Sequence, residues 1–357
     1  MRRTKWRSLL TGLSVRDPID PDRSLVASAT SSDAVTVDHW LLALATPFFY
    51  FSDPSKRLFW GYLLSSGLLG LGYAYARGRN ADRTLPLANL LTRAYWWNRS
   101  TRQDYVLLFI NATLKVGVYI PLIGGQLAFA IMTARFLNQS VADAPQVAIS
   151  SITVSLLFTL SAFTFDDFTR FLTHRGMHAW GPLWRCHRVH HAATILTPFT
   201  VFRTHPVESL INYCRAVCAL GFITGLFIWG FGQHLQVWDI LGVNALGFVL
   251  TALGANLRHS HIPLSFGALE KWLVSPAQHQ LHHSLDHHHP NFGSFLSCWD
   301  RWFGSWMPGT EANDLRFGLR RSEEECQTNT PRHVTPGYGM SQVRTPPKTV
   351  DLITPLA

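Results

Sequence analysis

The chain has 357 residues, of which 47% are hydrophobic and only 15% are charged, and its formal net charge is +9. Soluble domains carry charges at about 25% of their positions, so this composition favours a protein that is largely embedded in a bilayer. The basic residues flank apolar stretches and do not cluster on a soluble module. This distribution argues against nucleic-acid binding and fits anionic lipid head groups.

The N-terminal third of the chain predicts a tail followed by membrane-associated segments. Residues 1–37 are polar and aperiodic, which is typical of a flexible tail. The apolar run over 39–51 either lies in the membrane interface or completes a first hairpin. Residues 58–76 carry no charge and are long enough to cross a bilayer. The arginine-rich segment 77–104 is then expected to be a cytoplasmic loop, by the positive-inside rule.

Four further apolar stretches form two pairs, and each pair is joined by a short polar link. Each pair predicts a transmembrane hairpin that returns the chain to the cytoplasmic side. The histidine-rich segments after the hairpins are therefore expected to lie together on that side. The paired stretches are 116–133 with 147–165 and 216–232 with 237–254, and the segments that follow them are 166–215 and 255–310.

These patterns predict an all-α integral membrane fold. It consists of two transmembrane helical hairpins plus an N-terminal span or hairpin, capped by a cytosolic helical domain that holds two metal ions. A soluble protein with buried helices is the alternative, and four uncharged runs of this length disfavour it. The expected regions are a tail over 1–37, a membrane segment and basic loop over 38–104, a catalytic membrane domain over 105–310 and a polar tail over 311–357.

The histidines of this chain are concentrated in one part of the sequence. Twelve of the 17 lie between His174 and His283. They include one HxxxH motif over 174–178 and two HxxHH motifs over 187–191 and 279–283. Because residues i and i+4 of a helix are about 40° apart around its axis, and i+3 lies nearby, each motif is expected to present its imidazoles on one face.

Three such motifs together predict a metal site, although a single motif would be only weak evidence for one. Eight to ten histidines suffice for two metal ions, and neutral imidazole suits iron, zinc, copper or nickel. The run His287–His289 precedes Pro290 and is expected to be a solvated loop. His39, His234 and His333 stand alone and are expected to have structural or surface roles.

The order and surroundings of the motifs resemble the fatty acid hydroxylase/sterol desaturase superfamily, over roughly 145–306. Each histidine motif of this chain stands beside a short string that is similar to one in that superfamily. The strings are Asp167-Phe168 before the first motif, Arg203-Thr204-His205-Pro206-Val207-Glu208, Asn256-Leu257-Arg258-His259-Ser260, Ser275-Pro276-Ala277-Gln278, Asn291-Phe292-Gly293 and Trp299-Asp300-Arg301-Trp302-Phe303-Gly304.

The resemblance implies a set of metal ligands and of carboxylates that orient them. Each carboxylate has an alternative role as the salt-bridge partner of Arg170, Arg203 or Arg301. The implied ligands are His174, His178, His187, His190, His191, His259, His279, His282 and His283, with His205 and His261 as further candidates, and the carboxylates are Asp167, Glu208 and Asp300.

The same resemblance implies two iron ions, for which zinc can substitute in purified protein, and O₂ as co-substrate. The expected reaction is hydroxylation or desaturation of a lipid that reaches the metals from the bilayer. Electrons must come from a separate ferredoxin, cytochrome b5 or flavoprotein reductase, because the sequence has no nucleotide-binding fingerprint and no CxxC spacing. Arg185, Arg188 and Arg301 are candidates for docking an acidic donor, with ordinary positive-inside topology as the alternative.

Three other functions are alternatives to an oxygenase. A zinc-dependent membrane hydrolase would be expected to carry a carboxylate base in its motif, and the sequence has no HExxH. A metal-binding or metal-transport protein would be expected to place histidines or acids inside its spans, which are almost free of them. An inactive relative that senses lipids would not need intact histidine motifs.

Overall fold

The computed structural model describes most of the chain between the two predicted tails. The predicted tail over 1–37 lies almost entirely outside the described residues, as do most of 311–357 and the middle of the segment 77–104. The chain divides into a first unit, Met1–Leu319, and a second unit, Arg320–Ala357, of which only Arg320 is described. The described ranges are 37–78, 92–141, 149–232, 239–240, 243–287, 289–311 and 315–320.

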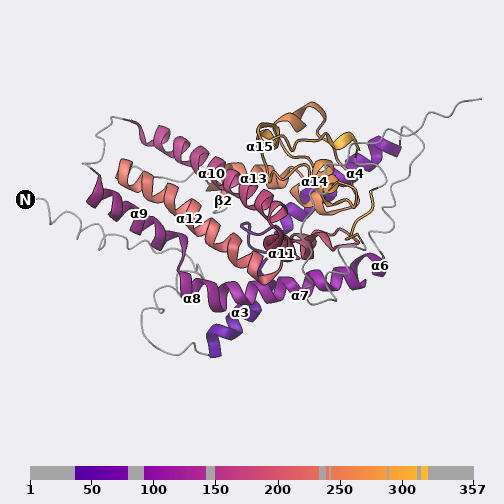
Figure 1. Cartoon of the computed structure of the whole chain (residues 1–357), viewed down its shortest axis with the longest axis horizontal. Coiled ribbons are helices and arrows are strands. Elements are labelled where there is room, and N and C mark those ends of the chain that lie inside the picture. Colours follow the sequence, from indigo (N-terminus) through magenta and orange to yellow (C-terminus); the bar gives the residue numbers. More distant parts are fainter. Residues whose placement is uncertain are drawn as a thin grey trace, which may run out of the picture. The chain divides into compact units, whose positions relative to one another are not determined.

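The first unit is almost wholly helical in its described part, as the sequence predicts (Figure 1). A short antiparallel ladder between β1 (Asp239–Ile240) and β2 (Val243–Asn244) is an exception. The α-helices are α3 (Val37–Phe49), α4 (Trp60–Gly78), α6 (Arg93–Trp96), α7 (Arg99–Leu114), α8 (Ile120–Ile123), α9 (Gln126–Ser140), α10 (Ser151–Ala179), α11 (Gly181–His191), α12 (Pro206–Phe231), α13 (Ala245–Ala252), α14 (Pro276–His283) and α15 (Cys298–Trp302). A π-helix η1 (Lys115–Tyr119) and the 3₁₀ turns η2 (Thr200–Phe202), η4 (Ala255–His259), η5 (Gly267–Lys271) and η6 (Gly309–Glu311) complete the list.

Three helical stretches are long and apolar enough to cross a membrane: Arg99–Ser140, Ser151–Ala179 and Pro206–Phe231. Large apolar side chains on them are exposed, as lipid contact requires; Leu127 is 67% exposed and Ile152 is 68% exposed. The prediction of a membrane protein is therefore confirmed. The N-terminal candidate, α4, is a helix of 19 residues but is not among the three, because its tyrosines, glycines and serines lower its hydropathy.

The helix boundaries differ from those that hydropathy predicts. Helix α7 begins at Arg99, inside the expected loop, because the side chain of Asn98 accepts a hydrogen bond from the Thr101 backbone N–H and caps it. The expected span over 116–133 is interrupted at Gly124, whose φ of 80° ends α8 in a conformation that favours glycine. Hydropathy alone cannot detect either signal, since both depend on local backbone geometry.

The second predicted hairpin is not found in its simple form. Its first limb is α12, but the helix in its second limb, α13, has only 8 residues. At 1.5 Å per residue α13 is about 12 Å long, which is too short to cross a bilayer. The predicted turn over 233–236 lies outside the described residues, so the hairpin topology and the cytoplasmic side of the histidines stay predictions.

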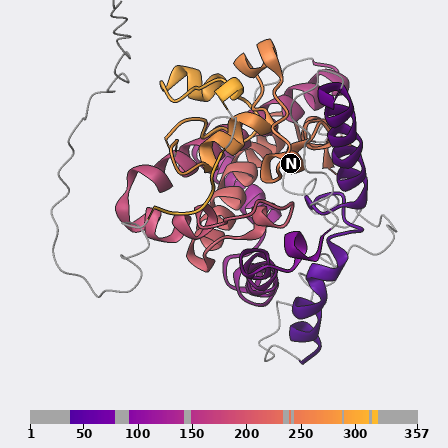
Figure 2. The same ribbon diagram turned by 90° about the vertical axis from the view of Figure 1, so that its right-hand side faces the viewer.

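Helix α12 packs between α9 and α10 (Figure 1). Against α9 the backbones approach closely, because a Cβ added at Gly225 would lie 2.5 Å from the Ala130 carbonyl oxygen. Such small-residue contacts are typical of helix pairs in membranes. Against α10 the contact is a cluster of buried apolar side chains that includes Phe158 and Phe227. Helix α4 packs against η4 and α13, and Figure 2 shows it along one edge of the unit.

The length of α10 positions the first histidine motif. Its 29 residues make a helix about 43 Å long, whereas the hydrocarbon core of a bilayer is about 30 Å thick. The helix begins at the cap provided by Ser150, whose hydroxyl accepts from the Thr153 backbone N–H. His174 and His178 lie in the last two turns, so they fall at or beyond the apolar boundary.

Candidate metal centre

Helices α10 and α11 carry the first two histidine motifs. Helix α10 ends at Ala179, and α11 starts directly afterwards at Gly181 with Pro182 in its first turn, where a proline is tolerated. The short connection folds α11 back, so that the His187 ring lies 4.9 Å, between centroids, from the rings of both His174 and His178.

The remaining histidines come from the segment after α13. Helix α14 carries the third motif and begins at a capping box, in which Ser275 and Gln278 bond each other's backbone N–H groups. His259 ends the 3₁₀ turn η4, and the Gln280 side chain ties α14 to η4 by donating to the Leu257 carbonyl. Both elements are buried around the histidines.

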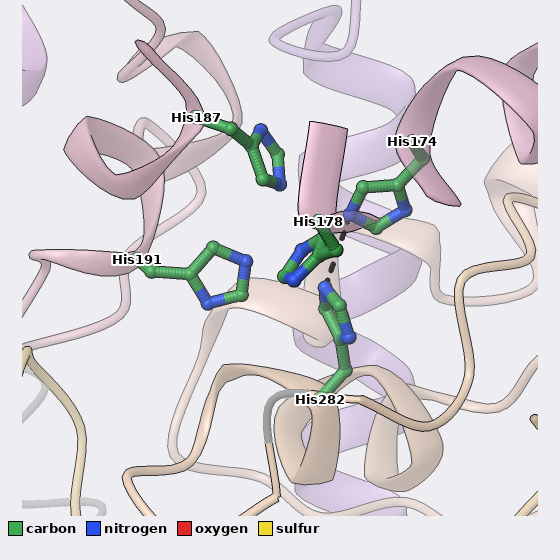
Figure 3. Close-up of side chains that lie close together, drawn as sticks. All are labelled: His174, His178, His187, His191 and His282. Carbon is green, nitrogen blue, oxygen red and sulfur yellow. Dashed lines mark hydrogen bonds between the residues drawn. The ribbon is translucent and has the colours of Figure 1, made fainter. Parts of the chain in front are cut away.

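Nine histidines form two adjacent groups; within each group, one ring nitrogen from every histidine lies within 4.8 Å of those of the other members. Figure 3 shows the first group, whose rings converge from α10, α11 and α14. All nine residues are among the eleven ligand candidates predicted from the sequence; their ligand role stays a prediction. The first group contains His174, His178, His187, His191 and His282, and the second contains His190, His259, His279 and His283.

The two HxxHH motifs are each divided between the groups. The i and i+4 residues of the second motif, His187 and His191, join the first group, while His190 joins the second. In the third motif His279 and His283 join the second group, while His282 joins the first. The expectation that each motif presents all its rings on one face is therefore wrong for the two HxxHH motifs, whereas His174 and His178 of the HxxxH motif do share a group. Residues i+3 and i+4 are about 100° apart around the helix, so they point to different groups.

The spacing of the nitrogens fits metal coordination. In the second group the Nε2 atom of His259 lies 3.2 Å from those of His279 and His283 and 3.4 Å from that of His190. In the first group the Nε2 atoms of His174 and His282 are 3.0 Å apart (Figure 3). Two nitrogens about 2.1 Å from one metal, at tetrahedral or octahedral angles, lie about 3.0–3.4 Å apart.

The chemical state of the rings also fits metal binding. Burial lowers the pKa of both His187 and His190 to about 3, so these imidazoles are neutral and keep a lone pair for a metal. Among the described residues, the buried Nε2 atoms of His178 and His187 have no hydrogen-bond partner. Buried polar atoms normally have partners, and a metal ion would supply one here.

In three ligand candidates the Nδ1 atom, which points away from the first group, contacts an oxygen acceptor. Nδ1 of His187 lies 2.9 Å from Oε1 of Glu208, at the start of α12. Nδ1 of His174 lies 2.8 Å from the Phe292 carbonyl, and Nδ1 of His282 lies 2.9 Å from the Pro290 carbonyl. Each acceptor fixes its ring in the tautomer with hydrogen on Nδ1, which directs the Nε2 lone pair into the first group.

Asp300 acts on the centre through the backbone. Its carboxylate accepts from the N–H groups of Phe292 and Gly293 and from the Ser305 hydroxyl, at 2.7–2.8 Å. It thereby holds the turn whose Phe292 carbonyl contacts His174. Burial raises the pKa of Asp300 to about 6, and these hydrogen bonds oppose that rise.

Asp167 holds the next part of the same segment. Its carboxylate accepts from the backbone N–H groups of Phe295 and Leu296 and from the Trp299 indole. The alternative of a salt bridge to an arginine is not found for Asp167, Glu208 or Asp300 within the described ranges. Arg170 pairs with Asp166 and Arg203 with Asp104, and Arg301 donates to the Lys271 carbonyl.

Two further ligand candidates lie apart from both groups. His205 caps α12, and its Nδ1 accepts from the Val207 backbone N–H. The ring of His261 packs against Tyr95 at 5.3 Å. Of the histidine run, His289 is exposed and His287 contacts the Ser284 hydroxyl, while residue 288 is not described.

Sequence reasoning missed several residues around the centre. Asp104 is fully buried and pairs with Arg203, and its being the one acidic residue of α7 was the available signal. Glu270 is 2% exposed and accepts from the hydroxyl of Ser275, which caps α14. Trp184 lies one turn before the second motif on α11, with its ring 5.0 Å from that of His178. No motif marks these positions, and Asp104 lies 99 residues from its partner Arg203.

Comparison with known proteins agrees with this geometry. Residues 159–305, which include all nine grouped histidines, match the fatty acid hydroxylase family. This segment is similar to that family. The resemblance predicted from the histidine motifs is therefore confirmed.

Three relatives of the fatty acid hydroxylase segment have names that specify lipids. A Delta(7)-sterol 5(6)-desaturase erg3B of Aspergillus fumigatus is 28% identical over 165 residues, 46% of this chain and 43% of the relative. Ornithine lipid hydroxylase OlsE of Rhizobium tropici is 28% identical over 155 residues, 43% of each chain. An alkylglycerol monooxygenase of Danio rerio is 25% identical over 160 residues, 44% of this chain and 32% of the relative. The match thus spans less than half the length of these relatives. No solved structure matches the chain.

Proposed function

We propose that this protein is a membrane-bound, non-haem di-iron enzyme that uses O₂ and an external electron donor to hydroxylate or desaturate a lipid. The observation that carries the proposal is the pair of adjacent all-histidine groups at the end of a membrane-length helix. The family match over residues 159–305 and the names of the relatives support oxidation of a lipid.

The nine histidines would hold the two ions, five around one and four around the other. When bound, the iron pair would supply activation of O₂ and oxidation of a C–H bond. The protein's own contribution is positional. Glu208 and the carbonyls of Phe292 and Pro290 fix the rings, while burial keeps bulk water from the nitrogens.

The surface of α10 supports access from the bilayer. Leu172, which is 42% exposed, lies two residues before His174, so an apolar surface continues to the level of the first motif. Trp180, which is 61% exposed, follows the end of α10, and tryptophan is enriched where membrane and water meet. A lipid beside α10 would therefore reach the level of the histidines along the helix axis from within the bilayer.

We further propose that the electrons come from a separate carrier and that the histidines face the cytoplasm. The proposed regions remain those of the sequence analysis, with the catalytic membrane domain over 105–310. Arg185 is exposed on α11, close to the second motif, and is a candidate for contacting an acidic carrier.

The test is to purify the full chain in detergent and to measure bound metal, reductant-dependent O₂ consumption and oxidised lipid by mass spectrometry. Two irons per chain, with O₂ uptake coupled to a lipid product, are expected. A single zinc with hydrolytic activity would replace the proposal with a zinc-dependent membrane hydrolase. Metal binding without O₂ uptake for any lipid tested would indicate a metal-binding protein instead.

A further inference from the structure

Arg203 caps the C-terminal end of helix α11, which carries the second histidine motif. Its Nε donates to the Val189 carbonyl at 2.8 Å, and its Nη2 donates to the Ala192 carbonyl at 3.3 Å. The last carbonyls of a helix lack partners within the helix and carry partial negative charge, so a guanidinium is well suited to this place. The two bonded carbonyls lie immediately before and after His190 and His191.

The histidines between these carbonyls belong to different groups. His190 lies in the second group and His191 in the first. A small rotation or shift of the last turn of α11 would therefore move one potential ligand of each ion at once. The hydrogen bonds from Arg203 to this turn therefore help to set the positions of the two groups relative to each other.

Asp104, on α7, fixes the Arg203 side chain in turn. Its Oδ1 accepts from Nη1 of Arg203 at 3.1 Å, and both side chains are almost completely buried. Its Oδ2 accepts from the hydroxyls of Thr200 and Thr197, at 2.8 and 3.4 Å. The carboxylate is therefore held from both sides, and it compensates the buried positive charge of Arg203.

Other groups of α7 hold the same guanidinium. Nη1 of Arg203 also donates to the Ser100 carbonyl, and Nη2 donates to the Gln103 side chain at 2.6 Å. Helix α7 lies outside residues 159–305, the part of the chain that matches the family. The metal centre is thus supported by an N-terminal helix that the family match does not include.

We propose that Asp104 is a positioning residue for the metal centre and that it acts through Arg203 on the turn of α11 that holds His190 and His191. The inference rests on the metal-binding part of the proposed function. Asp104 touches no ligand candidate in the described contacts, so its effect is on where the imidazoles lie. Its expected signature is a change in coordination geometry in a protein that is otherwise folded.

The experiment measures Co²⁺ binding to the full chain in detergent, for the wild type and Asp104→Asn. Asparagine keeps the size of the side chain and an acceptor for Arg203 but removes the charge. Helical content and a single peak in size-exclusion chromatography establish folding, and the visible absorption of bound Co²⁺ reports coordination geometry. We expect Asp104→Asn to bind two Co²⁺ with an altered spectrum and with affinity reduced about tenfold, the lower end of what outer-sphere changes cause.

The control is Asp166→Asn, which removes two other Asp–Arg interactions, one with Arg170 on the same helix and one with Arg215 on α12. It should leave the Co²⁺ spectrum and affinity unchanged. Identical spectra and affinities for wild type and folded Asp104→Asn would overturn the inference, as would equal changes in both variants. If Asp104→Asn does not fold, Arg203→Lys decides by the same criteria, since lysine keeps the charge but cannot reach both carbonyls and Asp104.

Failure of the proposed metal centre can be distinguished from failure of the role proposed for Asp104. A wild-type protein that binds no Co²⁺ at these histidines would contradict the proposed metal centre itself. A wild type that binds two Co²⁺ beside an unaffected Asp104→Asn variant would contradict only the role of Asp104.

Discussion

Nδ1 of His187 lies 2.9 Å from Oε1 of Glu208, and both side chains are 4% exposed. The contact joins the second histidine motif on α11 to the first turn of α12. Of the three carboxylates predicted to surround the centre, Glu208 contacts a ligand candidate directly, whereas Asp167 and Asp300 hold the backbone of the segment over 292–299.

Replacing Glu208 with alanine should weaken metal binding in the first group. The ring of His187 would lose the acceptor that fixes its tautomer, and outer-sphere changes of this kind cost about 10- to 100-fold in metal affinity. Metal retained after dialysis against a graded chelator, measured by mass spectrometry, checks this. Glu208→Gln, which keeps an acceptor oxygen, should retain more metal than Glu208→Ala. Equal retention by wild type and Glu208→Ala would contradict the role of this contact.

Neighbouring histidines of the third motif should affect different ions. His282 belongs to the first group and His283 to the second, so His282→Ala and His283→Ala should each lose mainly one of two bound ions. Metal stoichiometry, together with the coordination spectrum of the remaining Co²⁺, distinguishes the two variants. Indistinguishable spectra in the two variants would show that the division into groups is wrong.

The stability of the protein should depend on pH through Asp300. Its pKa of about 6 is above the ordinary value of 3.8, so between these values the folded state binds more protons than the unfolded state. Stability should therefore fall as pH rises from about 4 through 6, by up to about 3 kcal/mol in all, and this contribution should level off by about pH 7. Thermal unfolding in detergent from pH 4 to 7 checks this, and Asp300→Asn should show a smaller slope than the wild type. Parallel curves for the two proteins would refute the assignment.

The contact between α9 and α12 should tolerate no larger side chain at Gly225. An added Cβ would lie 2.5 Å from the Ala130 carbonyl oxygen and 2.6 Å from the Thr133 Cβ. Gly225→Ala should therefore lower the unfolding free energy by about 1–3 kcal/mol, the usual cost of overpacking. Gly230→Ala, on the same helix with nothing within 4 Å of the added Cβ, is the control and should show no loss. Equal melting temperatures for the two variants would contradict the close approach.

The grouping of the ligand candidates was largely predictable because its signal is local. Spacings of three and four residues place imidazoles near one another on any helix, and eight of the nine grouped histidines have such a spacing; His259 is the exception. His205 and His261 have no histidine three or four residues away, and both lie outside the groups. His205 caps α12, and the ring of His261 packs against Tyr95. The helical, membrane-embedded character was equally predictable, since it follows from composition and uncharged runs.

The sequence by itself determined that this is a helical membrane protein with three helix-borne histidine motifs. Only the tertiary structure decided how the motifs divide into groups of five and four, because that depends on the rotation of α11 and α14 about their axes. The tertiary structure also decided which acidic residues contact the histidines or the residues that support them. The partners of Asp104 and Glu208 lie on other helices, and contacts between residues distant in sequence leave no local pattern.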